Sequence, residues 1–229
     1  MKSIALALLL GLAPAAFAEE AKKDEAAEAL FKKVEEKYAG AKTVQYSVKM
    51  VAKSESDSID MTMSVACKAG NLFVVSGEGN VSAMDLKMEM KSDGKKMKSL
   101  LNGAGGKISD VTQAREGLLR GGMVRAGLFT ALDDLEKKEL PKMEEQYPVK
   151  DLKSEADEKV GERAAKVISF TVSVKGKEAS VAVRLWIDAD TSAVLKREGK
   201  STDGETSSEA YTGTTFDAEI ADEKFALPK

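Results

Sequence analysis

Two parts of the chain alternate apolar and polar residues with a period of two, and a segment of helical character separates them. The clearest alternation lies at 84–91, where one face is apolar and the other is charged. A period of two puts successive side chains on opposite faces of a strand. Such one-sided strands are typical of an antiparallel sheet that is packed on one face only.

The order of the predicted elements indicates a single domain of the α+β class, with helices against the concave face of a long curved antiparallel sheet. Apolar residues at spacings of three and four predict a helix at 24–38. Asp110, followed by Gln113, resembles a helix N-cap, and a helical stretch to about Leu140 is predicted to hinge near Gly121-Gly122. Strands are predicted at 43–53, 59–67, 72–75, 84–91 and 95–101, and again from 149 to 215, with a flexible break at 102–106.

The composition excludes several classes of function. The chain of 229 residues has no His and one Cys, which rules out Ser-His and Cys-His catalysis, His-ligated metals and an intrachain disulfide. Lys and Arg number 35 against 38 Asp and Glu, a formal charge of −3, which argues against nucleic-acid binding. With no nucleophile–base pair in sight, we expect no enzymatic activity and no cofactor.

The first eighteen residues have the features of a cleaved signal peptide. Lys2 precedes an apolar run at 4–12, and Ala16-Phe17-Ala18 gives the small-x-small pattern of a cleavage site. The apolar run is short for a membrane span. We therefore expect cleavage before Glu19, a domain at 19–229, and a periplasmic or secreted location.

Several short motifs resemble the outer-membrane lipoprotein carrier family. They are the helix-to-strand opening Leu30-Phe31-Lys32-Lys33-Val34, the turn Asp93-Gly94-Lys95, the run Leu185-Trp186-Ile187-Asp188-Ala189-Asp190-Thr191, and the ending Phe225 to Pro228. The resemblance covers most of the mature chain in the order of its elements. It implies an unclosed β-barrel around an apolar cavity, with helices as a lid.

The resemblance also implies a function. Carriers of this superfamily hold the acyl chains of lipoproteins in the cavity, whereas relatives act as envelope sensors or lipid binders. The carriers have an Arg on an early strand that engages the lid. The first Arg of this chain is Arg115, inside the predicted lid. Neither of the predicted strands 43–53 and 59–67 contains Arg, and Lys is the basic residue of the first.

The apolar faces of the predicted strands and helices would form the cavity. Methionine is unbranched and adapts to ligands of varied shape, although a dry core would show the same alternation. The predicted lining residues are Met61, Met63, Met84, Leu86, Met88, Met90, Leu118, Met123, Leu128, Phe170, Val183 and Leu185.

Three motifs resemble metal-binding or phosphate-binding sites, but none of them has the complete set of residues that such a site requires. The Met61-x-Met63 and Met88-x-Met90 pairs suit copper(I), but strand geometry alone puts such pairs on one face. The Asp188-x-Asp190-x-Ser192 run lacks the Gly and the bidentate Glu of a calcium loop. The Gly-rich run before Lys107 lacks the first Gly and the Ser or Thr of a phosphate loop. We expect no metal.

The sequence thus predicts a periplasmic carrier for an acyl chain, a lipoprotein or a similar apolar ligand, with a role in lipid transport and outer-membrane biogenesis. The alternative is a non-catalytic envelope sensor or interaction module of the same fold. The expected partners are lipid or lipoprotein acyl chains, together with an envelope membrane protein in the sensor alternative. We expect a monomer.

Overall fold

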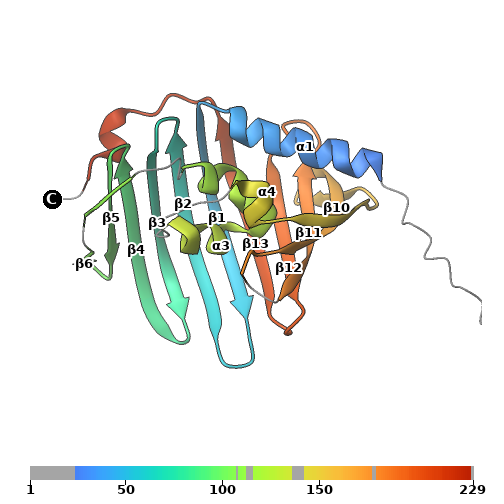
Figure 1. The fold of residues 1–229 in the computed structure, drawn as a ribbon, viewed down its shortest axis with the longest axis horizontal. Helices are drawn as coiled ribbons and strands as arrows, with labels where there is room; N and C mark the ends of the chain where they lie inside the picture. Colours follow the sequence, from blue (N-terminus) through green and yellow to red (C-terminus); the bar gives the residue numbers. More distant parts are fainter. Residues whose placement is uncertain (1–23, 107, 112–115, 136–141, 177–178, 228–229) are drawn as a thin grey trace, which may run out of the picture.

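The strands form one 13-stranded antiparallel sheet in which the first strand pairs with the last. The computed structural model describes residues 24–106, 108–111, 116–135, 142–176 and 179–227, so the predicted signal peptide, Gln113 and Arg115 lie outside it. The sheet begins at β6 and ends at β8, and these two edges do not pair with each other. The predicted unclosed α+β barrel is therefore confirmed (Figure 1).

The first half of the sheet is an up-and-down meander. The predicted strand at 43–53 coincides with β1, but β3 continues to Val81, well past the predicted end at Val75. The predicted break at 102–106 is a turn that leads into a short strand on the edge of β5. The strands are β1 (Thr43–Lys53), β2 (Ser58–Lys68), β3 (Leu72–Val81), β4 (Met84–Asp93), β5 (Lys96–Leu101), β6 (Ala104–Gly105) and β7 (Ser109–Asp110).

The second half continues the sheet from the other side of β1. The last strand, β13, therefore lies in the middle of the sheet, where it joins the two meanders. Its strands are β8 (Val149–Ser154), β9 (Glu158–Val160), β10 (Arg163–Ser173), β11 (Ser180–Asp188), β12 (Val194–Ser201) and β13 (Thr206–Phe216), followed by a 3₁₀ turn, η2 (Asp222–Phe225).

Helix α1 (Glu25–Gly40) forms for reasons that are visible in the sequence. The Asp24 carboxylate caps it by accepting a hydrogen bond from the Ala27 amide at 3.0 Å. The pKa of Asp24 is lowered by a hydrogen bond from the Ser154 amide and by this one from Ala27. Its apolar stripe is buried against the second half of the sheet, where the ring of Phe31 meets the ring of Phe170 edge-on at 5.2 Å. The Tyr38 hydroxyl accepts a hydrogen bond from the Val194 amide of β12 at 3.1 Å.

The remaining helices are short and lie over the centre of the sheet. A π-helical turn, η1 (Leu118–Gly122), runs directly into α2 (Met123–Ala126), and α3 (Leu128–Leu135) follows. The predicted hinge at Gly121-Gly122 is therefore wrong, because the helical break falls at Gly127, which has a φ of 86°. Asp110 lies in β7 and does not cap a helix, and α4 (Met143–Gln146) was not predicted.

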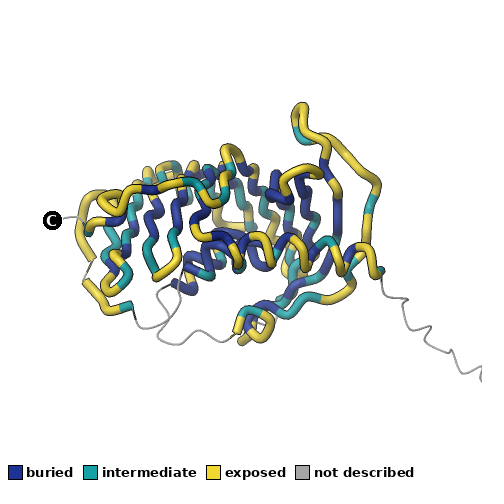
Figure 2. The backbone as a smooth tube through the Cα atoms, turned by 90° about the horizontal axis from the view of Figure 1, so that it is seen from above, coloured by how far each residue is buried: buried dark blue, intermediate teal, exposed yellow. Residues whose placement is uncertain are grey.

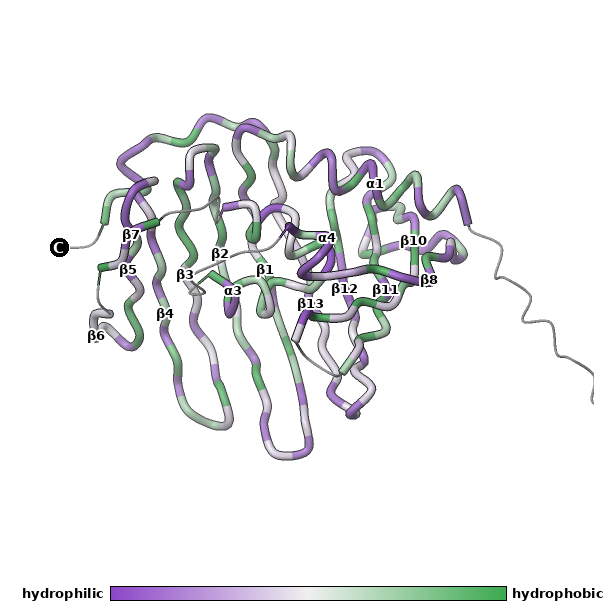
Figure 3. Tube along the Cα trace, in the orientation of Figure 1, coloured by the Kyte–Doolittle hydropathy of each residue, from purple (hydrophilic) through white to green (hydrophobic). Residues whose placement is uncertain are grey.

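The helices and the sheet enclose one main apolar core. Figure 2 shows buried residues on the strands and on the helices that face them. Figure 3 shows green and purple alternating along several strands, as the sequence pattern requires. In the part of the chain that the structure describes, no helix has the length and apolar character needed to cross a membrane.

The conformation of Gly127 predicts a stability effect. A Cβ atom there would lie 2.8 Å from Oε1 of Glu209 and 2.9 Å from Nη1 of Arg197, in a backbone conformation that favours glycine. We expect Gly127→Ala to lower the free energy of unfolding by about 1–3 kcal/mol, measured by urea denaturation. Gly204→Ala is the control, because Gly204 also has a positive φ, 95°, but faces open space. Equal losses in both variants would show that the close approach at Gly127 does not matter.

Candidate functional site

Most of the predicted cavity residues meet between the concave face and the helices. Nine of the twelve are buried in the main core, and Leu86 and Met88 are half-buried and pack against it. Met84 differs, because it is 67% exposed and lies at the start of β4, away from this core. The buried nine are Met61, Met63, Met90, Leu118, Met123, Leu128, Phe170, Val183 and Leu185.

Two clefts remain open on the inner face, and both reach the same side chain of α3. Phe129 is 49% exposed and lines each of them. The first cleft, of about 200 Å³, is mainly apolar and is lined by Met61, Met63, Leu86, Met88, Met90, Phe129, Leu132 and Asp133. We call it the methionine cleft.

The second cleft has a volume of about 270 Å³ and lies toward β12 and β13. Its apolar lining includes Met50, Ile59, Ala126, Phe129 and Val181, and its polar lining includes Arg197 and Glu209. We call it the arginine cleft. Apolar and charged side chains therefore meet at one site, the arrangement that an amphipathic ligand requires.

Buried polar contacts fasten the first part of the lid to the rest of the protein. Arg125 of α2 forms a two-pronged ion pair with Glu35 of α1, with Nη2 and Oε2 at 2.9 Å, and also donates to the carbonyl of Tyr147. The Tyr46 hydroxyl of β1 donates to the carbonyl of Leu119 at 2.9 Å. Arg120 donates to the carbonyl of Ala41. The segment η1–α2 is therefore held to α1, to the α1–β1 connection and to β1.

Helix α3 is fastened mainly at its two ends. At its start, the Leu128 amide donates to Oε1 of Glu209 at 2.9 Å. Toward its end, Asp134 accepts hydrogen bonds from Gln146 at 2.8 Å and from the Tyr147 hydroxyl. Phe129, between these anchors, lies over the two clefts. A change at Gly127 would therefore move the side chain that both clefts share.

Burial sets the protonation of the groups near the site. It raises the pKa of Tyr46 and of Tyr211 well above the ordinary value, and their rings meet edge-on at 5.7 Å. It also raises the pKa of the buried Cys67 thiol from 9.0 to about 12. Among the described residues, no cluster of His, Cys, Asp and Glu has the arrangement of a metal site.

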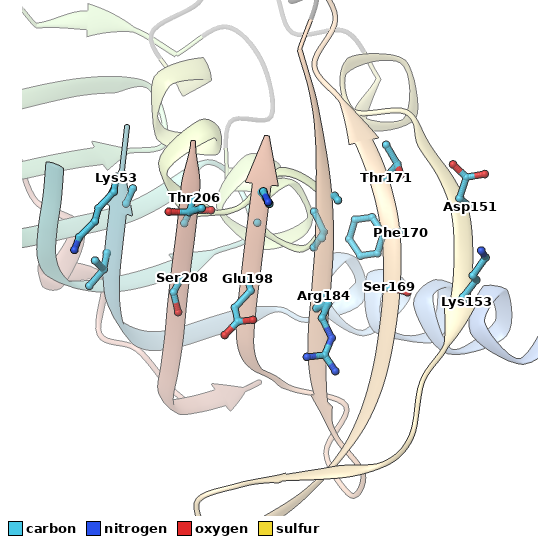
Figure 4. A pocket seen from close by; sticks show the side chains of 17 residues that line it. Lys53, Asp151, Lys153, Ser169, Phe170, Thr171, Arg184, Glu198, Thr206 and Ser208 are labelled. Atoms are coloured by element: carbon cyan, nitrogen blue, oxygen red, sulfur yellow. The ribbon is translucent and has the colours of Figure 1, made fainter. Parts of the chain in front are cut away.

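A wider hollow of about 620 Å³ lies on the opposite face of the sheet (Figure 4). Arg184, Glu198 and Ser208 lie opposite one another on β11, β12 and β13, and Arg184 alternates with the buried Val183 and Leu185. Arg184 is paired with Glu155 and Glu158. Trp186 is buried next to it. This hollow therefore has no buried group in need of a ligand.

The residues that sequence reasoning missed are those that join the lid to the sheet. The predicted set of lining residues includes neither Phe129 nor Arg197. Arg125 lies in α2, within the predicted lid, and no role was predicted for it. The one feature of the sequence that could have indicated a role for Arg125 was its charge inside a mostly apolar stretch.

Comparisons with known proteins show the fold. No protein-family model matches the sequence, and no curated protein matches it. The structure is similar to the lipoprotein LppX of Mycobacterium tuberculosis, with 13% identity, a TM-score of 0.51, and coverage of 87% of this chain and 99% of that chain. LprF of Mycobacterium bovis gives 14% identity, a TM-score of 0.52, and coverage of 86% and 95%.

A more distant likeness is to a LolA superfamily protein, NE2245 of Nitrosomonas europaea, with 14% identity, a TM-score of 0.35, and coverage of 87% and 97%. The likenesses to LppX and LprF extend over nearly the whole of both proteins. They show that this chain shares the fold of LppX and LprF.

The different positions of two methionines lead to a prediction. Met63 is buried, and a Cβ atom at Gly77 would lie 2.5 Å from its Cγ, so its side chain is closely packed. We expect Met63→Ala to lower the free energy of unfolding by about 2–5 kcal/mol. Met84→Ala should change it by less than about 0.5 kcal/mol, because Met84 is exposed. Thermal and urea unfolding of both variants would measure this, and similar losses would contradict the burial of Met63.

The raised pKa of Cys67 predicts its reactivity. Because the folded thiol stays protonated at pH 8, a disulfide reagent such as dithionitrobenzoate should not label the native protein. The unfolded chain, whose thiol regains an ordinary pKa, should react within minutes under the same conditions in urea. Fast labelling of the native protein would show that Cys67 is accessible.

Proposed function

We propose that this protein is an envelope carrier that holds an acyl chain, or a similar apolar ligand, between the concave face of the sheet and α3. The observation that carries the proposal is the pair of clefts that share Phe129. Signal-peptide removal before Glu19 and a periplasmic location are part of the proposal. So are the absence of catalysis and the monomeric state.

The energetics of transfer support a site of this size and character. Each buried CH₂ group contributes about 0.8 kcal/mol, so a chain of about fourteen groups prefers the bilayer by about 11 kcal/mol. A soluble carrier must cover most of that chain to compete. The apolar inner face extends from β10 to β4 and supplies such a surface.

The clefts are smaller than an ordinary ligand pocket, which measures about 300–1,000 Å³. Displacement of Phe129 would join them into one space within that range. We therefore propose that ligand uptake moves α3 about Gly127, while η1 and α2 stay fixed by the Arg125–Glu35 pair. The methionines of the first cleft would refit around the chain.

A charge at position 129 tests the location of the site. After delipidation, the protein should bind pyrene-labelled hexadecanol, a neutral probe, with a fluorescence change. We expect Phe129→Asp to weaken this binding at least about tenfold. A bound ligand would cover the introduced carboxylate, and removing this charge from water costs free energy.

Leu101→Asp is the matched control, because Leu101 is also exposed but lies on the edge strand β5, outside both clefts. It should bind the probe like the wild type. If the delipidated wild-type protein takes up no probe and no lipid is detected by native mass spectrometry of the gently purified protein, the carrier function is refuted.

A further inference from the structure

A buried arginine in the arginine cleft has almost no partner. Arg197 is 3% exposed, and its Nε atom has no hydrogen-bond acceptor. Its single hydrogen bond is a long one, 3.4 Å from Nη2 to the carbonyl of Arg125. Among the described residues it forms no ion pair, although every other buried arginine does. A buried charge with so few hydrogen-bond partners is costly, and an anion that reached this guanidinium would supply them.

The nearest candidate within the protein is already engaged. Glu209 lies directly opposite Arg197 in the pairing of β12 with β13. Its Oε1 accepts from the Leu128 amide, and its Oε2 accepts from the Tyr211 hydroxyl. Both oxygens of the Glu209 carboxylate therefore accept hydrogen bonds, one from the start of α3 and one from the core. The guanidinium group of Arg197 remains available to a ligand.

A continuous path leads from Arg197 to the methionine cleft. In the sheet register, Arg197 is followed by Glu209, Met50, Met61, Gly79 and Leu86 on successive strands. Strands lie about 4.8 Å apart, so the path from β12 to β4 is about 24 Å long. One membrane acyl chain spans half of a hydrocarbon core of about 30 Å, which is shorter than this path. A single chain therefore fits with its head at Arg197 and its tail beneath Phe129.

We propose that the ligand is a long-chain fatty acid whose carboxylate pairs with Arg197, an inference that rests on the proposed function. The planar guanidinium fork matches the two oxygens of a carboxylate. A carboxylate brings one negative charge to a site that already contains Glu209, whereas a phosphate monoester would bring nearly two. The rest of the path is mainly apolar and suits the tail.

The experiment compares ligands that share a tail and differ only in the head. Hexadecanoate, hexadecanol and hexadecyl phosphate would each compete with pyrene-labelled hexadecanol for the delipidated full chain at pH 8. We expect hexadecanoate to bind at least about tenfold more tightly than hexadecanol. Arg197→Met should remove this difference, and Arg197→Lys should retain part of it.

A control and a stability measurement separate binding from a structural role. Lys200→Met removes an exposed cation from the same strand and should keep the preference for the acid. The melting temperature of ligand-free Arg197→Met should equal or exceed that of the wild type, because an unpaired buried charge is lost. A large fall in melting temperature would instead indicate that Arg197 is structural.

The wild-type measurements alone can overturn the inference. If hexadecanoate and hexadecanol bind equally well, the carrier function stands and the carboxylate assignment is wrong. If hexadecyl phosphate binds most tightly, the head group is a phosphate and the assignment is again wrong. If none of the three compounds competes or binds, the proposed function fails as well.

Discussion

The inner face of the sheet carries more apolar surface than its short helices can cover, and the rest of the structure follows from this mismatch. The pairing of β1 with β13 makes one continuous face from two meanders. Helix α1 covers the part of this face near β10, whereas η1, α2 and α3 cover its centre. Space remains beside α3, where Phe129 is shared by two clefts. A closed barrel or a longer lid would leave no such space.

The polar contacts of the lid divide it into a fixed part and a part that can move. The fixed part is held by Arg125 with Glu35 and by Tyr46 with the backbone of η1. The Tyr46 contact is buried and the Arg125–Glu35 pair is partly buried, and a hydrogen bond away from water is stronger and costs more to lose. The other part, α3, begins at the left-handed Gly127 and is anchored at its ends. The same short stretch of chain therefore combines a firm attachment and a hinge.

The strands could be predicted from the sequence because the alternation of apolar and polar residues shows directly which face of a strand is buried. It therefore located β1 and β4 and most of the inner-face residues, including Met61 and Met63. The predicted β3 was too short because Gly77 and Gly79 have low strand propensity. These glycines are explained only by the tertiary structure. The side chain of Met63 occupies the position where a Cβ atom of Gly77 would lie. Such a contact between strands cannot be inferred from one strand alone.

Arg197 illustrates a different limit. Val194 and Leu195 are both buried, and the pairing of β11 with β12 shifts its register near this point, so alternation cannot assign a face to the residues that follow. A charged side chain in such a strand is expected to face solvent. Here it lies close to Gly127 and opposite Glu209, and its Nε atom has no hydrogen-bond partner. An unpaired buried charge lowers the stability of the ligand-free protein. Evolution retains such an arrangement when it strengthens the binding of a ligand. The unpaired guanidinium would therefore give a ligand with a negative head the part of its affinity that an apolar surface cannot provide.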